Sequence, residues 1–123
     1  MENEFLQVII NILNNSKDEF ERTSLEHKYI FISAKISENR IKVTIKDNAG
    51  GIDEKIINKV FKPYFTTKDD SKGTGIGLYM SKQIIEKHMK GTISVSNENY
   101  VYENIEYKGA IFEITFLEKL QHK

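Results

Sequence analysis

Gly73-Thr74-Gly75-Ile76-Gly77-Leu78 is the stretch that decides the fold, because its three alternating glycines run directly into an apolar-periodic segment. A backbone without Cβ atoms can bring its N–H groups close to a phosphate group. The helix predicted to follow directs its positive N-terminal end toward the same place. A glycine loop alone is weak evidence, since glycines also form ordinary turns. The stretch gains its meaning from three unusual segments that precede it.

Length and composition describe one domain, spanning 1–123, with a hydrophobic core. The 123 residues are 39% hydrophobic and include seven Phe and six Tyr, enough for a single domain. Lys and Arg total 18, as do Asp and Glu, and this balance argues against a nucleic-acid binder. The absence of Cys excludes disulfides and thiolate metal sites. No apolar run reaches the roughly 20 residues of a membrane span, so we expect a cytoplasmic domain, whose parent chain could carry a membrane anchor.

The spacing of apolar residues predicts three helices. A stripe at helical spacing predicts a long helix over Asn3–Phe20 and a second over Ile76–His88, which Gly91 ends as a C-cap. Asp53 is positioned to cap a short helix that extends to Val60.

Alternating apolar residues predict a sheet beneath these helices. The strands are expected at Tyr29–Ser37, Ile41–Lys46, Thr92–Ser96 and Ala110–Leu117. Glu38-Asn39-Arg40 is expected as a tight turn, and the polar segment Asn97–Lys108 as a flexible hairpin connection. The fold class is therefore α/β, of the α+β kind: a two-layer sandwich of helices on a mixed, mostly antiparallel sheet.

The first unusual segment is the asparagine pair of the first helix. Asn11 and Asn15 lie four residues apart and project from one face. Asparagine is unfavourable inside a helix, and its amide oxygen is a hard ligand suited to Mg²⁺. Taken alone, such a pair is more often a solvated helix face.

The second and third segments point to a purine base and its phosphates. Asp47-Asn48-Ala49-Gly50-Gly51-Ile52 follows a strand, and a carboxylate there can accept a hydrogen bond from an exocyclic amine such as that of adenine. Phe61-Lys62-Pro63-Tyr64-Phe65-Thr66-Thr67-Lys68 combines aromatic anchors with hydroxyls and a cation that can reach phosphates. Taken singly, the former also fits a simple turn, and the latter a hydrophobic plug.

In this order and spacing, the segments resemble the ATP-binding catalytic domain of sensor histidine kinases, in the superfamily of gyrase B, Hsp90 and MutL. The first helix matches the N box, with Asn15 at the Mg²⁺ position. Asp47–Gly51 matches the G1 box, whose Asp reads the adenine amino group. Phe61–Phe65 matches the F box, and Gly73–Leu78 matches the G2 box, which closes over the phosphates.

The resemblance covers Leu6 to Phe116 and implies a Bergerat-type fold that lacks its first strand and helix, leaving a sheet edge that could form non-native dimers. It implies Mg·ATP as the ligand, with Asn15 as the metal ligand. The residues expected around ATP are Asn11, Asn15, Asp47, Gly51, Ile52, Phe61, Thr67, Lys68, Gly73, Thr74, Gly75, Ile76, Gly77 and Leu78.

Three departures from the family patterns refine this expectation. The ATP-hydrolysing relatives carry a Glu base where this chain has Asn11, so attack by water should be slow. Ala49 replaces the first glycine of the G1 pattern, and Gly50 beside it should make the change tolerable. Asp18 stands where some members place a phosphate-contacting Lys, so Lys68 or Lys72 is expected to compensate.

The phosphoacceptor histidine of such kinases is not expected in this chain. His27, His88 and His122 lack the sequence context of an acceptor. The expected partners are therefore the dimerisation and phosphoacceptor domain of a parent kinase and, indirectly, a response regulator. Two alternatives remain: a stand-alone serine kinase of the anti-sigma-factor type, and a degenerate nucleotide-binding module.

Overall fold

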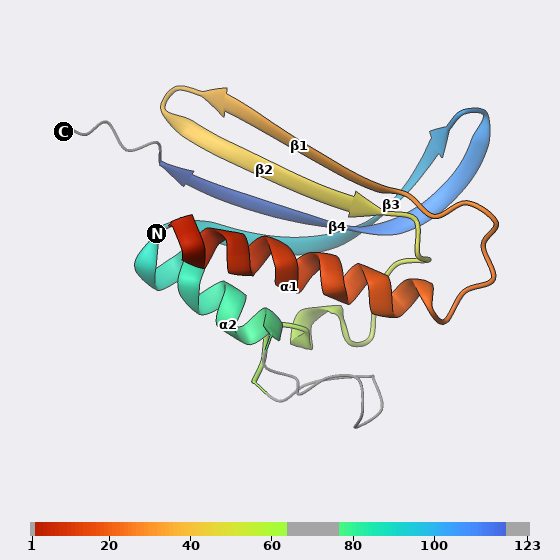
Figure 1. Cartoon of the computed structure of the whole chain (residues 1–123), viewed down its shortest axis with the longest axis horizontal. Coiled ribbons are helices and arrows are strands. Elements are labelled where there is room, and N and C mark those ends of the chain that lie inside the picture. The colour runs from red at the N-terminus through yellow and green to blue at the C-terminus, as the bar shows by residue number, and fades with distance from the viewer. Residues whose placement is uncertain (1, 64–76, 118–123) are drawn as a thin grey trace.

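Helices cover one face of a four-stranded sheet in the computed structural model, which describes residues 2–63 and 77–117 (Figure 1). The helices are α1 (Glu2–Phe20) and α2 (Gly77–Gln83), which continues as the π-helix η2 (Ile84–His88). The strands follow the order β1-β2-β4-β3 in the sheet, and their bounds are β1 (Ile30–Ser37), β2 (Arg40–Asp47), β3 (Thr92–Tyr102) and β4 (Ile105–Leu117). The predicted α+β sandwich is confirmed, and all three strand pairs among the described residues are antiparallel.

Both hairpins close through two-residue turns. Glu38 and Asn39 have φ values of 53° and 67°, and Glu103 and Asn104 have 52° and 68°, as in type I′ turns. The first turn confirms the predicted one. The expectation of a flexible connection over Asn97–Lys108 was wrong, because β3 and β4 remain paired up to the second turn.

The second hairpin is long because its tyrosines alternate along both strands. Tyr100 pairs with Tyr107, and Tyr102 pairs with Ile105, so large side chains line one face of the hairpin. Asn97, Asn99, Glu106 and Lys108 occupy the alternate positions, whereas Glu98 shares the face of the tyrosines. The sequence pattern was therefore that of a strand with period two.

Two predicted helices differ from the observed ones. The segment from Asp53 contains only the short 3₁₀ helix η1 (Ile57–Lys59), although the Asp53 side chain accepts the Lys55 N–H at 2.9 Å, as a capping residue does. At the end of η2 the residue with positive φ is Lys90, not Gly91. Gly91 is required for another reason, since a Cβ there would lie 2.3 Å from the Thr115 carbonyl oxygen.

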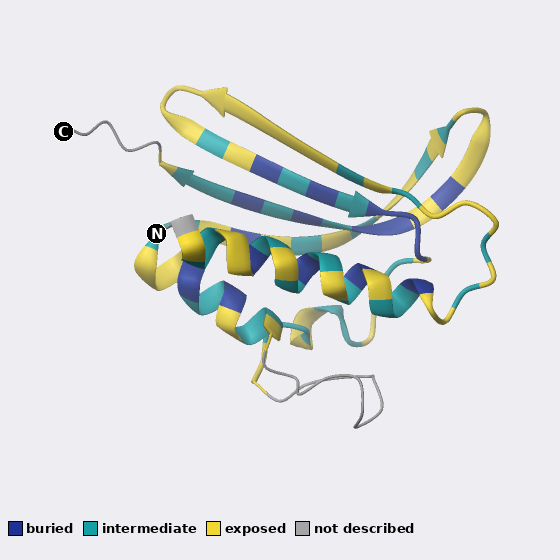
Figure 2. Cartoon of the chain, in the orientation of Figure 1, coloured by how far each residue is buried: buried dark blue, intermediate teal, exposed yellow. Residues whose placement is uncertain are grey.

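The hydrophobic core lies between the helices and three of the four strands. Its buried members include Val8, Ile12, Ile84, Ile85, Val43, Ile45, Ile93, Phe112 and Ile114. Figure 2 shows these buried positions along β2 and β4 and on the inner sides of the helices, whereas β1 carries no buried residue. The apolar face of β1 continues the core face of β2, but none of the described helices lies above it.

Candidate functional site

Asp47 occupies the end of β2, where Ser16 in the C-terminal part of α1 contacts it, and is only 3% exposed. Its Oδ1 accepts the backbone N–H groups of Ala49 at 3.0 Å and Ala110 at 3.1 Å. Its Oδ2 accepts the Ser16 hydroxyl at 2.7 Å. A buried carboxylate needs such donors, and three of them fix this one in a single orientation.

The chain turns sharply after Asp47. Gly50 and Gly51 have φ values of 103° and 83°, a region that favours glycine, and the Gly50 N–H donates to the Lys108 carbonyl at 2.9 Å. Ala49 is not among the described residues with positive φ. Ala49 therefore avoids the backbone conformation that a methyl group would strain, because the two glycines adopt the positive φ values of the turn.

Asn97 holds this turn from β3, and sequence reasoning missed it by assigning it to a loop. Its Oδ1 accepts the Ile52 N–H at 2.8 Å, and its Nδ2 donates to the Ile52 carbonyl at 2.7 Å and to Glu54 Oε2 at 2.8 Å. The amide thereby pairs with the Ile52 backbone as a neighbouring strand would. An asparagine at an inward position of an alternating strand was the available signal.

The β3–β4 hairpin also holds the main chain of Asp47. The Tyr100 hydroxyl donates to the Asp47 carbonyl at 2.7 Å, and burial, followed by the charges of Asp47 and Glu98, raises the pKa of Tyr100 to about 12. Gly109 lies so close that a Cβ there would sit 1.6 Å from the same carbonyl oxygen. A side chain at Gly109 would therefore displace Asp47.

The two asparagines of α1 have different surroundings. Asn11 donates to the Gly77 carbonyl at 3.1 Å and to the Ser81 hydroxyl at 3.0 Å, and it accepts a hydrogen bond from Gln7 at 2.9 Å. It therefore ties α1 to the start of α2. Asn15 is half-buried, and its side chain has no hydrogen-bond partner within the described part of the chain.

Mg²⁺ could be held by the Asn15 amide oxygen without a cluster of protein side chains around it. Over residues 2–63 and 77–117, no group of three His, Asp or Glu side chains could enclose a metal ion. Mg²⁺ keeps several waters and is usually held by one or two protein oxygens together with substrate phosphates. A single amide oxygen from Asn15 is compatible with that mode of binding.

Phe61 and Leu78 are described residues that precede and follow segment 64–76 in the chain. Phe61 packs edge-to-face on Phe112 with ring centroids 6.3 Å apart, and Leu78 packs against the same core. Phe61 therefore packs on the core, as both the aromatic anchor and the hydrophobic plug require, and its role at ATP stays a prediction. The remaining predicted residues of this region, Phe65, Thr67, Lys68, Gly73, Thr74, Gly75 and Ile76, lie outside the described residues.

The contacts of the two described histidines, His27 and His88, are with residues other than Asp47. The carbonyl of His27 accepts the Asn48 side chain at 3.0 Å, and its ring stacks on Tyr29. His88 is exposed, and its Nδ1 lies 2.7 Å from Glu4 Oε2 at the opposite end of α1. His122 lies outside the described residues.

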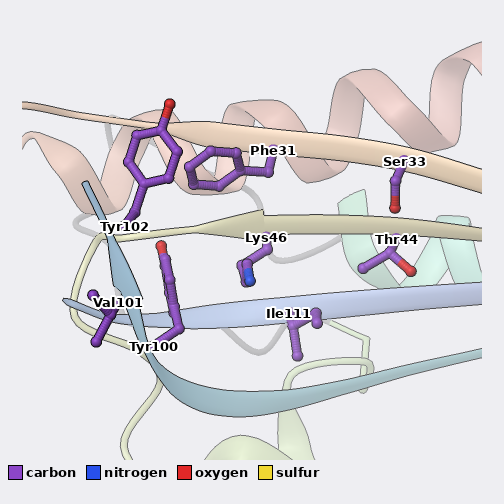
Figure 3. A pocket seen from close by; sticks show the side chains of 8 residues that line it. All are labelled: Phe31, Ser33, Thr44, Lys46, Tyr100, Val101, Tyr102 and Ile111. Atoms are coloured by element: carbon purple, nitrogen blue, oxygen red, sulfur yellow. The ribbon is translucent and has the colours of Figure 1, made fainter. Parts of the chain in front are cut away.

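A shallow cavity of about 340 Å³ occupies the other face of the sheet (Figure 3). Phe31, Tyr100 and Tyr102 line it, with the Lys46 ammonium 4.1 Å from the centre of the Tyr100 ring. Neither Asp47 nor Asn15 lines this cavity. Tyr100 lines the cavity and also donates a hydrogen bond to the Asp47 carbonyl.

Comparison with known proteins assigns this fold to the class of ATP-binding domains. The chain belongs to the family described as histidine kinase-, DNA gyrase B-, and HSP90-like ATPase, whose profile matches residues 1–120. The resemblance to the catalytic domain of sensor histidine kinases is confirmed.

Two curated relatives and one solved structure illustrate the match. Sporulation kinase A of Bacillus subtilis is 34% identical over 118 residues, or 96% of this chain. The putative sensor histidine kinase NtrY-like of Rickettsia bellii is 35% identical over 118 residues, or 95% of this chain. The chain spans 17% of the length of each. The nucleotide-free catalytic domain of histidine kinase ThkA shares 28% identity with a TM-score of 0.74, covering 96% of this chain and 69% of that one.

Within residues 2–63 and 77–117, every helix is too short or too polar to span a bilayer.

Proposed function

We propose that this chain binds Mg·ATP and presents the γ-phosphate to a histidine on a separate dimerisation domain of a sensor histidine kinase in two-component signalling. The observation that carries the proposal is the Asp47 carboxylate, which is buried and fixed by three donors. One of these donors, Ser16, follows Asn15 on α1, and the Asn15 side chain has no hydrogen-bond partner among the described residues. An acceptor held in this way matches the exocyclic amine of adenine.

The residues of this chain would act mainly by positioning. Asp47 would accept a hydrogen bond from the adenine amine, and Asn15 would hold Mg²⁺, which neutralises charge on the phosphates when bound. Asn11 is neutral and already donates to the backbone of α2, so it provides no base to activate water. ATP would therefore be retained until another nucleophile is positioned against its γ-phosphate.

The acceptor histidine is proposed to come from another domain. The described ring contacts of His27 and His88 are with Tyr29 and Glu4, and the His27 carbonyl accepts the Asn48 side chain at 3.0 Å. Transfer to a response regulator would follow from that histidine, and this chain would contribute to it only by supplying the phosphoryl group.

Calorimetric titration of the purified chain tests nucleotide binding. Asp47→Asn should weaken Mg·ATP binding by about 1–3 kcal/mol, because it removes a charge-assisted hydrogen bond, while the weak binding of GTP should change little. Asn15→Ala should remove most of the Mg²⁺ dependence, and Asn14→Ala, an exposed neighbour, is the matched control. If Asp47→Asn and Asn15→Ala bind like the parent, the site assignment is wrong.

Incubation with radiolabelled ATP tests the transfer step. The chain alone should form no stable phosphohistidine, and addition of a dimerisation domain that carries an acceptor histidine should produce one on that domain. Phosphohistidine on the chain alone contradicts the proposal. Phosphoserine on a small partner protein would favour the serine-kinase alternative.

A further inference from the structure

Ser16 follows Asn15 on α1 and makes an unusual hydrogen bond. Serine is unfavourable in a helix interior, and its hydroxyl commonly bonds back to a carbonyl of its own helix. Here the Ser16 hydroxyl instead crosses to β2 and donates to Asp47 Oδ2 at 2.7 Å. Ser16 is 1% exposed and Asp47 is 3% exposed, so the bond is shielded from water.

The hydrogen bonds to Asp47 leave little freedom to its carboxylate. The two oxygens of a carboxylate provide about four acceptor positions. The N–H groups of Ala49 and Ala110 both donate to Oδ1, and the hydroxyl of Ser16 donates to Oδ2. The remaining acceptor position therefore belongs to Oδ2, the oxygen whose direction Ser16 fixes.

We propose that Ser16 is a specificity-determining positioning residue for the purine base. It acts through Asp47, by holding Oδ2 in the direction from which it accepts the 6-amino group of adenine. Because the single hydroxyl proton of Ser16 is committed to Asp47, the pair presents an acceptor, and a base without a 6-amino donor gains nothing from it. This inference rests on the proposed function of the chain.

Ser16 and Asn15 are neighbours on α1, so the same helical turn carries both residues. Consecutive residues of a helix project about 100° apart, so Ser16 faces the end of β2 while Asn15 projects from another side of the same turn. One rigid turn of α1 would then fix both the base and the metal-bound phosphates. Pre-organisation of this kind reduces the entropy lost when a ligand binds.

The test compares ATP with purine riboside triphosphate, which lacks only the 6-amino group. Binding of both nucleotides to the full chain is measured by calorimetry for the parent, Ser16→Ala and Ser81→Ala. Ser81 is the matched control, since it is a buried helix serine whose hydroxyl contacts Gly77 and Asn11 and not Asp47. Alanine is the best helix former, so Ser16→Ala should keep α1 intact.

Ser16→Ala should lower the preference for ATP over the analogue roughly fivefold, the value of one ordinary hydrogen bond, with affinity for the analogue nearly unchanged. Ser81→Ala should leave the preference as in the parent, even if both affinities fall together. A parent-like preference in Ser16→Ala overturns the inference, whatever happens to the absolute affinities. If the parent itself fails to bind ATP, the proposed function fails first, and the two failures are thereby distinguished.

Discussion

The two edge strands of the sheet carry the same kind of side chain on the same face but bury it to very different extents. Ile32 of β1 pairs with Ile45 and is 55% exposed, whereas Ile93 of β3 pairs with Ile114 and is 6% exposed. The difference arises from the helices, because η2 packs against β3 while no described helix lies over β1. Alternation along a strand therefore indicates a face, and a covering element decides burial.

The largest expected effect is the difference in unfolding free energy between Ile93→Ala and Ile32→Ala. Ile93→Ala should lower the free energy of unfolding by about 2–5 kcal/mol, because it removes buried methyl groups and leaves a cavity. Ile32→Ala should change it by no more than about 0.5 kcal/mol, as is usual for exposed positions. Urea denaturation followed by circular dichroism measures both changes on the same chain.

Equal losses for the two variants would show that the face of β1 is covered in solution. The slope of unfolding free energy against urea should stay the same in both variants, since neither changes the surface that unfolding exposes. A changed slope in Ile32→Ala would point to association through that face, and the oligomeric state would then have to be measured at several concentrations.

The sequence predicted the fold well wherever a regular apolar period coincided with a covering element. The stripe of α1, the strands β1 and β2 and the turn between them follow from local spacing. The extent of β3 and β4 did not, because their outer halves alternate tyrosines with polar residues rather than aliphatic with polar ones. Burial of β1 could not be predicted either, since it depends on contacts between segments far apart in the chain.

The candidate site also contains residues that the sequence predicted and residues that it missed. Asp47, Asn15 and the glycine turn were predicted from residue types at fixed spacing along the chain. Asn97 and Ser16 were missed, because their roles depend on which strand or helix lies beside Asp47 in space. Residues that only hold a binding residue in place carry no motif of their own, so local sequence patterns reveal the binding residues first.

A smaller effect concerns Asn97 of β3, which holds the turn after Asp47 through two hydrogen bonds to Ile52. Asn97→Ala should lower the free energy of unfolding by about 1–3 kcal/mol, since it removes both hydrogen bonds from the half-buried backbone of Ile52. It should also weaken Mg·ATP binding. Asn99→Ala is the matched control, two residues along the same face and exposed, and should stay within about 0.5 kcal/mol of the parent.

Equal stability in the two asparagine variants would contradict the role assigned to the Asn97 amide. Calorimetry of both variants with Mg·ATP separates the two parts of the prediction. If stability falls and nucleotide affinity does not, Asn97 supports the fold of β3 but not the orientation of the turn.

The smallest expected effect concerns Tyr100, which lies farther along β3. Tyr100→Phe should cost about 1 kcal/mol near neutral pH, because the hydrogen bond to the Asp47 carbonyl is lost. Tyr102→Phe is the control, since no hydrogen bond is assigned to its hydroxyl within the described residues, and it should remain within about 0.5 kcal/mol of the parent.

The stability difference between the parent and Tyr100→Phe should fall as the pH rises. Burial is the main cause that raises the pKa of Tyr100 to about 12 in the folded chain, and an unfolded tyrosine titrates near about pH 10. Between these values the unfolded chain loses a proton that the folded chain keeps, so the stabilisation from Tyr100 is complete below about pH 10 and is lost as the pH rises toward 12. The stability gap between the parent and Tyr100→Phe should therefore narrow from about pH 8 to about pH 11 in urea titrations. A gap of constant size would mean that the hydroxyl of Tyr100 is open to water, and that β3 holds the Asp47 turn through Asn97 without help from Tyr100.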